Sequence, residues 1–230
     1  LRLMERCGSR LADALSAVIP YQELLFPAGS MEMVLPIYEQ GVAAAFYNRC
    51  VVAAIQGVLS EIPDQHTVIV LEVGAGSGGT ASSILPVVEK RCRKYVFTDV
   101  SSVFLRQARA RFAEYRFLET ALLNIDADPR LQGFALQEHD LLVSTNCLHA
   151  TPFICNTLRN CHALLSKSGV LVVNEAVQNT SFNQITFGLT DGWWLFAEVG
   201  DPERRGQASP LLTWQQWASL LSDSGFEQRR

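Results

Sequence analysis

The stretch LEVGAGSGGT, residues 71–80, decides the fold of this chain. It continues the apolar run VIV at 68–70, and a short run that is rich in β-branched residues and ends abruptly in glycines is typical of a buried parallel strand. A helical pattern follows over residues 80–88. The glycines therefore expose bare backbone beside a helix N-terminus, which is how proteins bind phosphate- or nucleoside-containing cofactors.

The glycines fit two kinds of cofactor site. Gly74, Gly76 and Gly79 satisfy the dinucleotide pattern G-x-G-x-x-G, and Asp99 follows at the distance of a ribose-binding carboxylate, which favours a nicotinamide or flavin cofactor. Glu72, however, precedes the first glycine by two residues, where a dinucleotide strand normally has an apolar side chain. The alternating glycines after this glutamate resemble motif I of the class I methyltransferases, E-x-G-x-G-x-G, which implies that the Glu72 carboxylate helps to position S-adenosylmethionine. An ordinary tight turn needs one or two glycines rather than four.

The composition favours one well-packed domain with an appendage. The chain has 230 residues, of which 48% are hydrophobic and 18% charged. A net charge of -4 argues against a nucleic-acid partner. We find no apolar run that approaches the length of a membrane span and no signal peptide, so we expect no membrane partner and a cytoplasmic location. The chain opens on Leu1, so we expect it to be a segment of a longer protein.

The cysteines and histidines do not form a metal-binding pattern. The 6 cysteines lack C-x-x-C spacing and do not pair with the 4 histidines as zinc ligands do. We therefore expect free thiols and no metal site.

Strand and helix patterns alternate along most of the chain. We expect strands near residues 68–72, 95–97, 117–125, 141–145 and 170–173. This alternation predicts an α/β fold with a doubly wound, mostly parallel sheet, covered by helices on both sides. Residues 1–60 read as helices and are expected to form a lid or a first packing layer, with Leu11, Leu15 and Val18 on one face of a first helix. Residues 61–230 form the predicted core, which has no room after Gly225 for two further strands that would close the sheet.

Two side chains at the ends of neighbouring strands predict acid–base chemistry. His149 follows the fourth strand and Glu175 follows the fifth. Adjacent parallel strands lie about 4.8 Å apart and ligands bind at their carboxyl ends, so we expect both side chains to face one crevice. A histidine whose ring is held by a carboxylate is a ready general base, which contributes on the order of 10²- to 10⁴-fold in rate. The alternative is that His149 is a capped loop residue.

Other residues are candidates for binding a cofactor or a substrate. Asp99, at the end of the second strand, can accept both hydroxyls of an adenosine ribose. Asn124 ends the third strand, where polar groups usually meet an adenine, and Asn146 ends the fourth. Tyr47 and Trp193 are candidates for the substrate side, the latter in the long connection 178–210, although both also fit ordinary packing.

Several motifs together resemble the methyltransferase domains embedded in modular polyketide synthases. They are LEVGAGSGGT, YVFTDVSSVFLRQARARF, NIDADPRLQGF, HDLLVSTNCLHAT, SGVLVVNE and TFGLTDGWW, and the likeness covers nearly the whole chain. The resemblance implies a Rossmann-like class I fold, S-adenosylmethionine as methyl donor, and an acyl carrier protein and neighbouring synthase domains as partners. It also implies that His149 and Glu175 are the catalytic pair, and that the cofactor is held by Glu72, Gly74, Ala75, Gly76, Gly78, Asp99, Asn124 and Asn146. The family often has aspartate where this chain has Asn124.

Our leading hypothesis is methylation of the α-carbon of a β-ketoacyl thioester, with His149 as the base. Methylation of a β-hydroxyl or enol oxygen on the same carrier is the close rival, because the same pair would serve it. A methyltransferase-like scaffold without activity and a nicotinamide reductase are the remaining alternatives.

Overall fold

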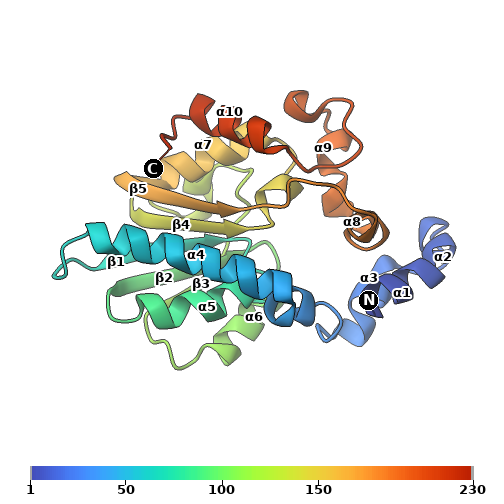
Figure 1. The fold of residues 1–230 in the computed structure, drawn as a ribbon, viewed down its shortest axis with the longest axis horizontal. Helices are drawn as coiled ribbons and strands as arrows, with labels where there is room; N and C mark the ends of the chain where they lie inside the picture. Colours follow the sequence, from blue (N-terminus) through green and yellow to red (C-terminus); the bar gives the residue numbers. More distant parts are fainter. Residues whose placement is uncertain (1, 229–230) are drawn as a thin grey trace.

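The centre of the molecule is a parallel sheet of five strands in the order β3-β2-β1-β4-β5. The computed structural model describes residues 2–228, and Figure 1 shows their fold. The strands are β1 (Val68–Val73), β2 (Cys92–Asp99), β3 (Leu118–Leu122), β4 (His139–Thr145) and β5 (Leu165–Asn174). Every neighbouring pair is parallel. The predicted doubly wound α/β fold is therefore confirmed.

Helices cover both faces of the sheet, which explains why β1 is buried at all its positions. Val68 and Val70 face a core shared with α4 (Val42–Glu61), α5 (Gly79–Val88) and α6 (Ser102–Arg111). Leu71 and Val73 face a second core shared with α7 (Ile154–Leu164) and α10 (Trp214–Asp223). The alternation of strand side chains thus fills two cores, one on each side.

The end of α7 and the start of α10 can each be compared with the local sequence pattern. The fifth strand begins earlier than the expected range 170–173, since α7 stops at Leu164 and Leu165 already pairs with His139 of β4. At the other end of the chain, Thr213 and Gln216 form a capping box at the start of α10, as a threonine before an apolar helix predicts.

The N-terminal helices form a small core of their own beyond the carboxyl ends of the strands (Figure 1). They are α1 (Arg2–Ser9), α2 (Leu11–Leu15), α3 (Tyr21–Leu25), the short turn η1 (Pro27–Gly29) and the π-helical turn η2 (Pro36–Gln40). The helix expected to carry Leu11, Leu15 and Val18 on one face ends at Leu15, and both Leu15 and Val18 are exposed. Leu3, Cys7 and the leucines at 24 and 25 are buried instead, and they pack against Phe182 and Ile185 of α8 (Ser181–Ile185).

Helix α4 belongs to the layer that covers the sheet. Val51, Ile55 and Leu59 pack into the first core, so of the predicted lid only residues 2–41 stand away from the sheet. Within residues 2–228, α4 is the one helix long and apolar enough to cross a membrane by length and composition, a test that core helices of soluble proteins also pass. The expectation that no apolar run approaches the length of a membrane span is therefore corrected for α4, which has 20 residues. The division at residue 60, the lack of closing strands and the cytoplasmic location stay predictions.

The connection after β5 lies over the carboxyl ends of β4 and β5 (Figure 1). It consists of short helices: α8, η5 (Phe187–Leu189), η6 (Asp191–Trp193), α9 (Leu195–Glu198) and η7 (Pro202–Arg204). Together with the N-terminal helices it surrounds the place where the strands end.

Candidate active site

The candidate site lies at the carboxyl ends of β1 and β4, where the strand order reverses. In doubly wound sheets this switch point is where ligands bind, because the loops after the two strands diverge to opposite faces.

The glycine loop after β1 turns tightly against the loop after β4. Gly74 has φ +66°, and a Cβ built there would lie 2.0 Å from the Cys147 Sγ atom, so only glycine fits. Ala75 donates its N–H to the Thr98 carbonyl oxygen at 2.9 Å, which fastens the loop to β2. Helix α5 starts directly after Gly78, and its N-terminus therefore faces the crevice.

Segment 36–40 lies over the glycine loop. A Cβ at Gly79 would come within 2.8 Å of the Tyr38 carbonyl oxygen. Glu39 forms a bidentate ion pair with Arg111 of α6, and the same guanidinium donates to the Ser77 carbonyl oxygen at 3.1 Å. The segment is thus fastened to the loop that the sequence assigns to the cofactor.

Asp99 joins the end of β2 to the glycine loop. Its Oδ2 accepts the Gly76 N–H at 3.0 Å and its Oδ1 accepts the Ser101 N–H at 2.8 Å. Burial raises the pKa of this carboxyl group, against the opposing effect of the backbone hydrogen bonds. Ser101 occupies the N-cap position of α6 without a side-chain bond, and Asp99 accepts the backbone N–H of Ser101 itself. Its predicted ribose contact stays a prediction.

Glu72 lies inside the first core, beneath the glycine loop. It is 2% exposed, and the Tyr95 hydroxyl donates to its Oε2 at 2.7 Å. Burial raises the pKa of Glu72 to about 8. The structure thus pairs Glu72 with Tyr95, and its predicted contact with the cofactor stays a prediction.

The structure brings His149 and Glu175 together. His149 lies on the 3₁₀ turn η4 (Leu148–Ala150), and its Nδ1 is 2.5 Å from the Glu175 Oε2. The Glu175 Oε1 accepts the backbone N–H groups of Cys147 at 3.0 Å and Leu148 at 2.7 Å. The pairing of Thr145 with Asn174 brings the two strand ends level. Because Nδ1 is engaged by the carboxylate, Nε2 is the ring nitrogen available for proton transfer.

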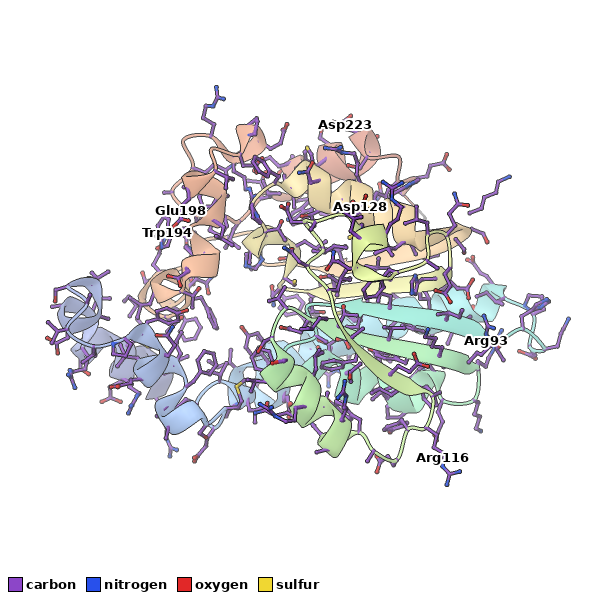
Figure 2. All side chains as sticks on the ribbon, turned by 180° about the vertical axis from the view of Figure 1, so that it is seen from behind. Arg93, Arg116, Asp128, Trp194, Glu198 and Asp223 are labelled. Carbon is purple, nitrogen blue, oxygen red and sulfur yellow. The ribbon has the colours of Figure 1, made fainter. Side chains whose placement is uncertain are left out.

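Trp193 packs beside the histidine, whereas Trp194 does not. The Trp193 ring is 4% exposed and meets the His149 ring edge to face, with 5.9 Å between centroids. Trp194 is at the surface and donates its indole N–H to the Gly188 carbonyl oxygen at 2.8 Å. Figure 2 shows Trp194 and Glu198 on the segment that faces the N-terminal helices, at the opposite end of the molecule from Arg93 and Arg116. Trp193 is therefore the tryptophan that contacts His149, and its place on the substrate side stays a prediction.

The structure does not bring Tyr47 into this group. Tyr47 is 52% exposed on α4 and packs against Phe46. Its neighbour Asn48 is buried instead, where it accepts from the Thr80 hydroxyl and donates to the Tyr38 carbonyl oxygen. The Tyr38 ring lies 6.0 Å from that of Phe187, and burial together with the nearby Cys147 thiol raises the pKa of its hydroxyl. Tyr38 thus lies near Cys147, in the loop that carries His149, a place that its helical spacing did not reveal.

The side chains of Asn124 and Asn146 each accept a backbone N–H and so stabilise the chain after a strand. The Asn124 Oδ1 accepts the Asp126 N–H at 3.1 Å, closing the turn after β3. Asn146 has φ +48°, and its Oδ1 accepts the Ala176 N–H at 3.0 Å, which ties the end of β4 to the residue after Glu175. Their predicted cofactor contacts stay predictions.

Arg204 is not among the residues predicted from the sequence, and its side chain has no exposed surface. It donates to the carbonyl oxygens of His149 at 2.6 Å, Thr151 at 2.7 Å and Pro152 at 3.0 Å. Its Nε donates to the Asp201 Oδ2 at 2.6 Å. The local sequence gives no signal of such burial, since the carbonyl oxygens that Arg204 binds lie 52 to 55 residues away in the chain.

No group of three or more histidine, cysteine, aspartate or glutamate residues within 2–228 has the arrangement of a metal site.

Comparisons with known proteins identify the class of domain. A family model described as a methyltransferase domain matches residues 71–171. The polyketide synthase ThaG of Burkholderia thailandensis is 37% identical over 97% of this chain, which spans only 4% of ThaG. The CurJ carbon methyltransferase is 35% identical, with a TM-score of 0.91 over 98% of this chain and 59% of that chain. The trans-methyltransferase CalH, solved in complex with SAH, is 27% identical, with a TM-score of 0.77 over 96% and 59%.

Proposed function

This chain belongs to the S-adenosylmethionine-dependent methyltransferase domains of polyketide synthases, and we propose that it methylates the α-carbon of a β-ketoacyl thioester on an acyl carrier protein. The observation that carries the proposal is the bond between His149 and Glu175 at the adjacent ends of β4 and β5, next to the glycine loop. Carrier protein and neighbouring synthase domains are the proposed partners, in keeping with relatives that are polyketide synthases.

The residues present fit a nucleoside-containing methyl donor. Gly74 leaves no room for a side chain between the β1 and β4 loops, so the loop offers bare backbone beside the α5 N-terminus. Asp99 places a carboxylate at the end of β2, where a ribose is held in this type of sheet. We assign these residues and Ala75, Gly76 and Gly78 to S-adenosylmethionine, and the structure of CalH with SAH supports that choice.

His149 is the proposed base. Its Nε2 takes the proton from the carbon between the two carbonyls of the acyl chain, and the electron pair of the broken C–H bond becomes an enolate. Glu175 stabilises the imidazolium that forms, and the two backbone amides at its Oε1 keep the carboxylate in place. When bound, S-adenosylmethionine would supply an electrophilic sulfonium methyl for the enolate carbon, with S-adenosylhomocysteine as the leaving group. The proton then passes from His149 to solvent.

Oxygen methylation uses the same pair and is the competing proposal. The name of the CurJ neighbour, a carbon methyltransferase, favours carbon. A hydroxyl substrate would give up its proton to the same Nε2, so the two reactions differ in the acyl chain and not in the base.

Intact mass spectrometry of loaded carrier protein separates these outcomes. We expect a β-ketoacyl carrier to gain one methyl in the presence of the domain and S-adenosylmethionine, and a β-hydroxyacyl carrier to gain none. His149→Ala should abolish the gain while S-adenosylmethionine still binds. A mass gain of one methyl on the hydroxyacyl form alone would show that the same residues catalyse oxygen methylation. No mass gain on either form would contradict the proposal.

A further inference from the structure

The loop that carries His149 is held from outside by a buried ion pair. The Arg204 and Asp201 side chains are 0% and 2% exposed, and both come from η7 and the residue before it. Removing a guanidinium from water is costly unless every donor finds a partner. Here the Asp201 carboxylate takes Nε, and carbonyl oxygens of residues 149, 151 and 152 take the two terminal nitrogens.

These carbonyl oxygens need a donor because the chain turns sharply there. The turn η4 ends at Ala150, so the carbonyls that follow have no intrahelical partner. Thr151 and Thr157 complete the hydrogen bonds on the other side of the loop, where the Thr151 hydroxyl donates to the Leu148 carbonyl oxygen at 2.8 Å. Within residues 2–228, Arg204 is the side chain that donates to the carbonyl oxygen of His149 itself, at 2.6 Å.

The same segment carries Trp193. The Trp193 ring packs on the His149 imidazole, and Phe196 lies under the Arg204 guanidinium with 5.2 Å to the ring centroid. Residues 193–204 therefore contact the histidine twice, once at its ring through Trp193 and once at its main chain through Arg204. A shift of this segment moves both contacts together.

We propose that Arg204, oriented by Asp201, is a positioning residue for His149. By holding the main chain of His149, Arg204 keeps the imidazole in hydrogen-bond contact with Glu175 and in ring contact with Trp193. The proposal rests on the proposed function for the role of His149 in turnover. A side chain with a planar fork of donors is required, because a lysine ammonium cannot span three carbonyl oxygens and a carboxylate at once.

The chain offers a matched control in Arg91. Its guanidinium also donates to several loop carbonyls, those of Leu59, Ile62, Pro63 and His66, at 2.7 to 3.2 Å. It too has an aspartate nearby, with 3.8 Å between Arg91 and Asp64. Arg91 directly precedes β2, at the end of the sheet where Figure 2 shows Arg93, and so lies away from the crevice. Arg91→Lys therefore removes a comparable set of guanidinium–carbonyl bonds without touching the loop that carries His149.

The test compares Arg204→Lys, Asp201→Asn and Arg91→Lys in this chain. The first readout is the downfield NMR resonance of the His149 Nδ1 proton, assigned by its loss in His149→Asn, which needs no substrate. The second is kcat and KM on the β-ketoacyl carrier, together with exchange of the α-proton into D₂O. We expect Arg204→Lys to lose or shift the resonance and to lower kcat and α-proton exchange roughly 10²-fold, because small misplacements of a reacting group cost about that much. The KM for S-adenosylmethionine should stay within about 2-fold, since the glycine loop is untouched.

Arg91→Lys should keep both the resonance and kcat even where it lowers Tm. If Arg204→Lys does not fold, Asp201→Asn is measured in its place. We expect Asp201→Asn to change the His149 Nδ1 resonance in the same way and to lower kcat by a smaller factor. Equal falls in kcat for Arg204→Lys and Arg91→Lys, in proportion to their falls in Tm, would overturn the proposal, as would an unchanged resonance in Arg204→Lys and Asp201→Asn. If the wild-type chain does not methylate, the proposed function is wrong, and the resonance still decides whether Arg204 positions His149.

Discussion

Glu175 fixes the tautomer of His149 because its Oε2 accepts the Nδ1 proton. Glu175→Gln keeps an oxygen for the amides of Cys147 and Leu148 but turns an amide N–H toward Nδ1. The proton then moves to Nε2, which can no longer act as a base. We expect kcat for methyl transfer to fall on the order of 10²- to 10⁴-fold with unchanged affinity for S-adenosylmethionine.

Single-turnover assays and calorimetry of S-adenosylmethionine binding measure the two quantities. Glu198→Gln, an exposed change on the neighbouring segment, should leave both as they are. Normal turnover in Glu175→Gln would contradict the assigned tautomer.

The buried carboxyl of Glu72 makes stability depend on pH. Its pKa is raised from 4.5 to about 8 in the folded chain, chiefly by burial. Between these values the folded chain binds a proton that the unfolded chain has lost, so the free energy of unfolding decreases as pH rises. The stabilising effect of the proton is complete below pH 4.5 and is lost as pH rises through about 8.

Glu72→Gln removes this titration while keeping an acceptor for the Tyr95 hydroxyl. Urea unfolding across the range from pH about 5 to about 8 should give a flatter pH dependence for the variant than for the wild type, by up to about 1 kcal/mol per pH unit. Equal slopes for the two proteins would show that Glu72 does not titrate in that window.

Residues differ in how much the sequence reveals of them. His149 and Glu175 could be paired in advance because each follows a recognisable strand and the order of strands places the two ends side by side. Arg204 could not, because a buried arginine is explained only by distant carbonyl oxygens. Tyr47 and Asn48 were equally hard to assign, since helical spacing alone does not say which of two neighbouring side chains is buried.

Among the elements, the glycine loop has the strictest geometry. Gly74→Ala places a Cβ 2.0 Å from the Cys147 Sγ atom in a residue with φ +66°. Gly133→Ala provides the matched control, because Gly133 has φ +85° but nothing within 4 Å of its Cβ position. The control should cost about 1–2 kcal/mol of stability from backbone strain alone, and Gly74→Ala about 1–3 kcal/mol more from overpacking.

Thermal unfolding gives the stabilities, and binding of S-adenosylmethionine gives the effect on the loop. We expect only Gly74→Ala to lose binding. A Gly74→Ala protein as stable as Gly133→Ala would mean that the loop relaxes around the clash.

Elements with strong apolar runs were predictable, and those decided by tertiary contacts were not. The runs of β1 and β4 and the capped helix α10 fall where the pattern places them. The start of β5 was missed because SKSG, residues 166–169, reads as a helix end, yet Leu165 pairs with His139. The apolar face expected at Leu15 and Val18 is exposed, because the N-terminal helices pack on Leu3, Leu24 and Leu25 instead.

In the molecule as a whole, one ion pair fastens segment 36–40 over the glycine loop. Arg111→Gln removes the bonds to Glu39 and to the Ser77 carbonyl oxygen. Because both side chains are partly exposed, the pair is worth up to about 1 kcal/mol. We therefore expect S-adenosylmethionine to bind up to about 5-fold more weakly, chiefly through faster dissociation, with the difference shrinking at high salt.

Lys94→Gln is the control, because it removes an ion pair with Glu119 at the starts of β2 and β3. Stopped-flow measurement of cofactor dissociation should distinguish the two variants. Equal rates for Arg111→Gln and wild type would show that the ion pair does not hold the segment during binding.

The fold and the family were the most predictable features. The alternation of strands and helices, the glycine loop and the quoted motifs predicted a class I methyltransferase domain of a polyketide synthase, and the comparisons confirm it. The N-terminal part was less predictable, since its core is completed by residues from the other end of the chain.

That shared core has a practical consequence for exchanging this domain between synthases. Leu3, Leu24 and Leu25 pack with Phe182 and Ile185, so the first helices and the connection after β5 share one core although about 160 residues separate them. A chimera joined between residues 25 and 42 would combine helices from one parent with their contacts from another. We expect such hybrids to expose apolar surface, and hybrids that take both segments from one parent to stay soluble.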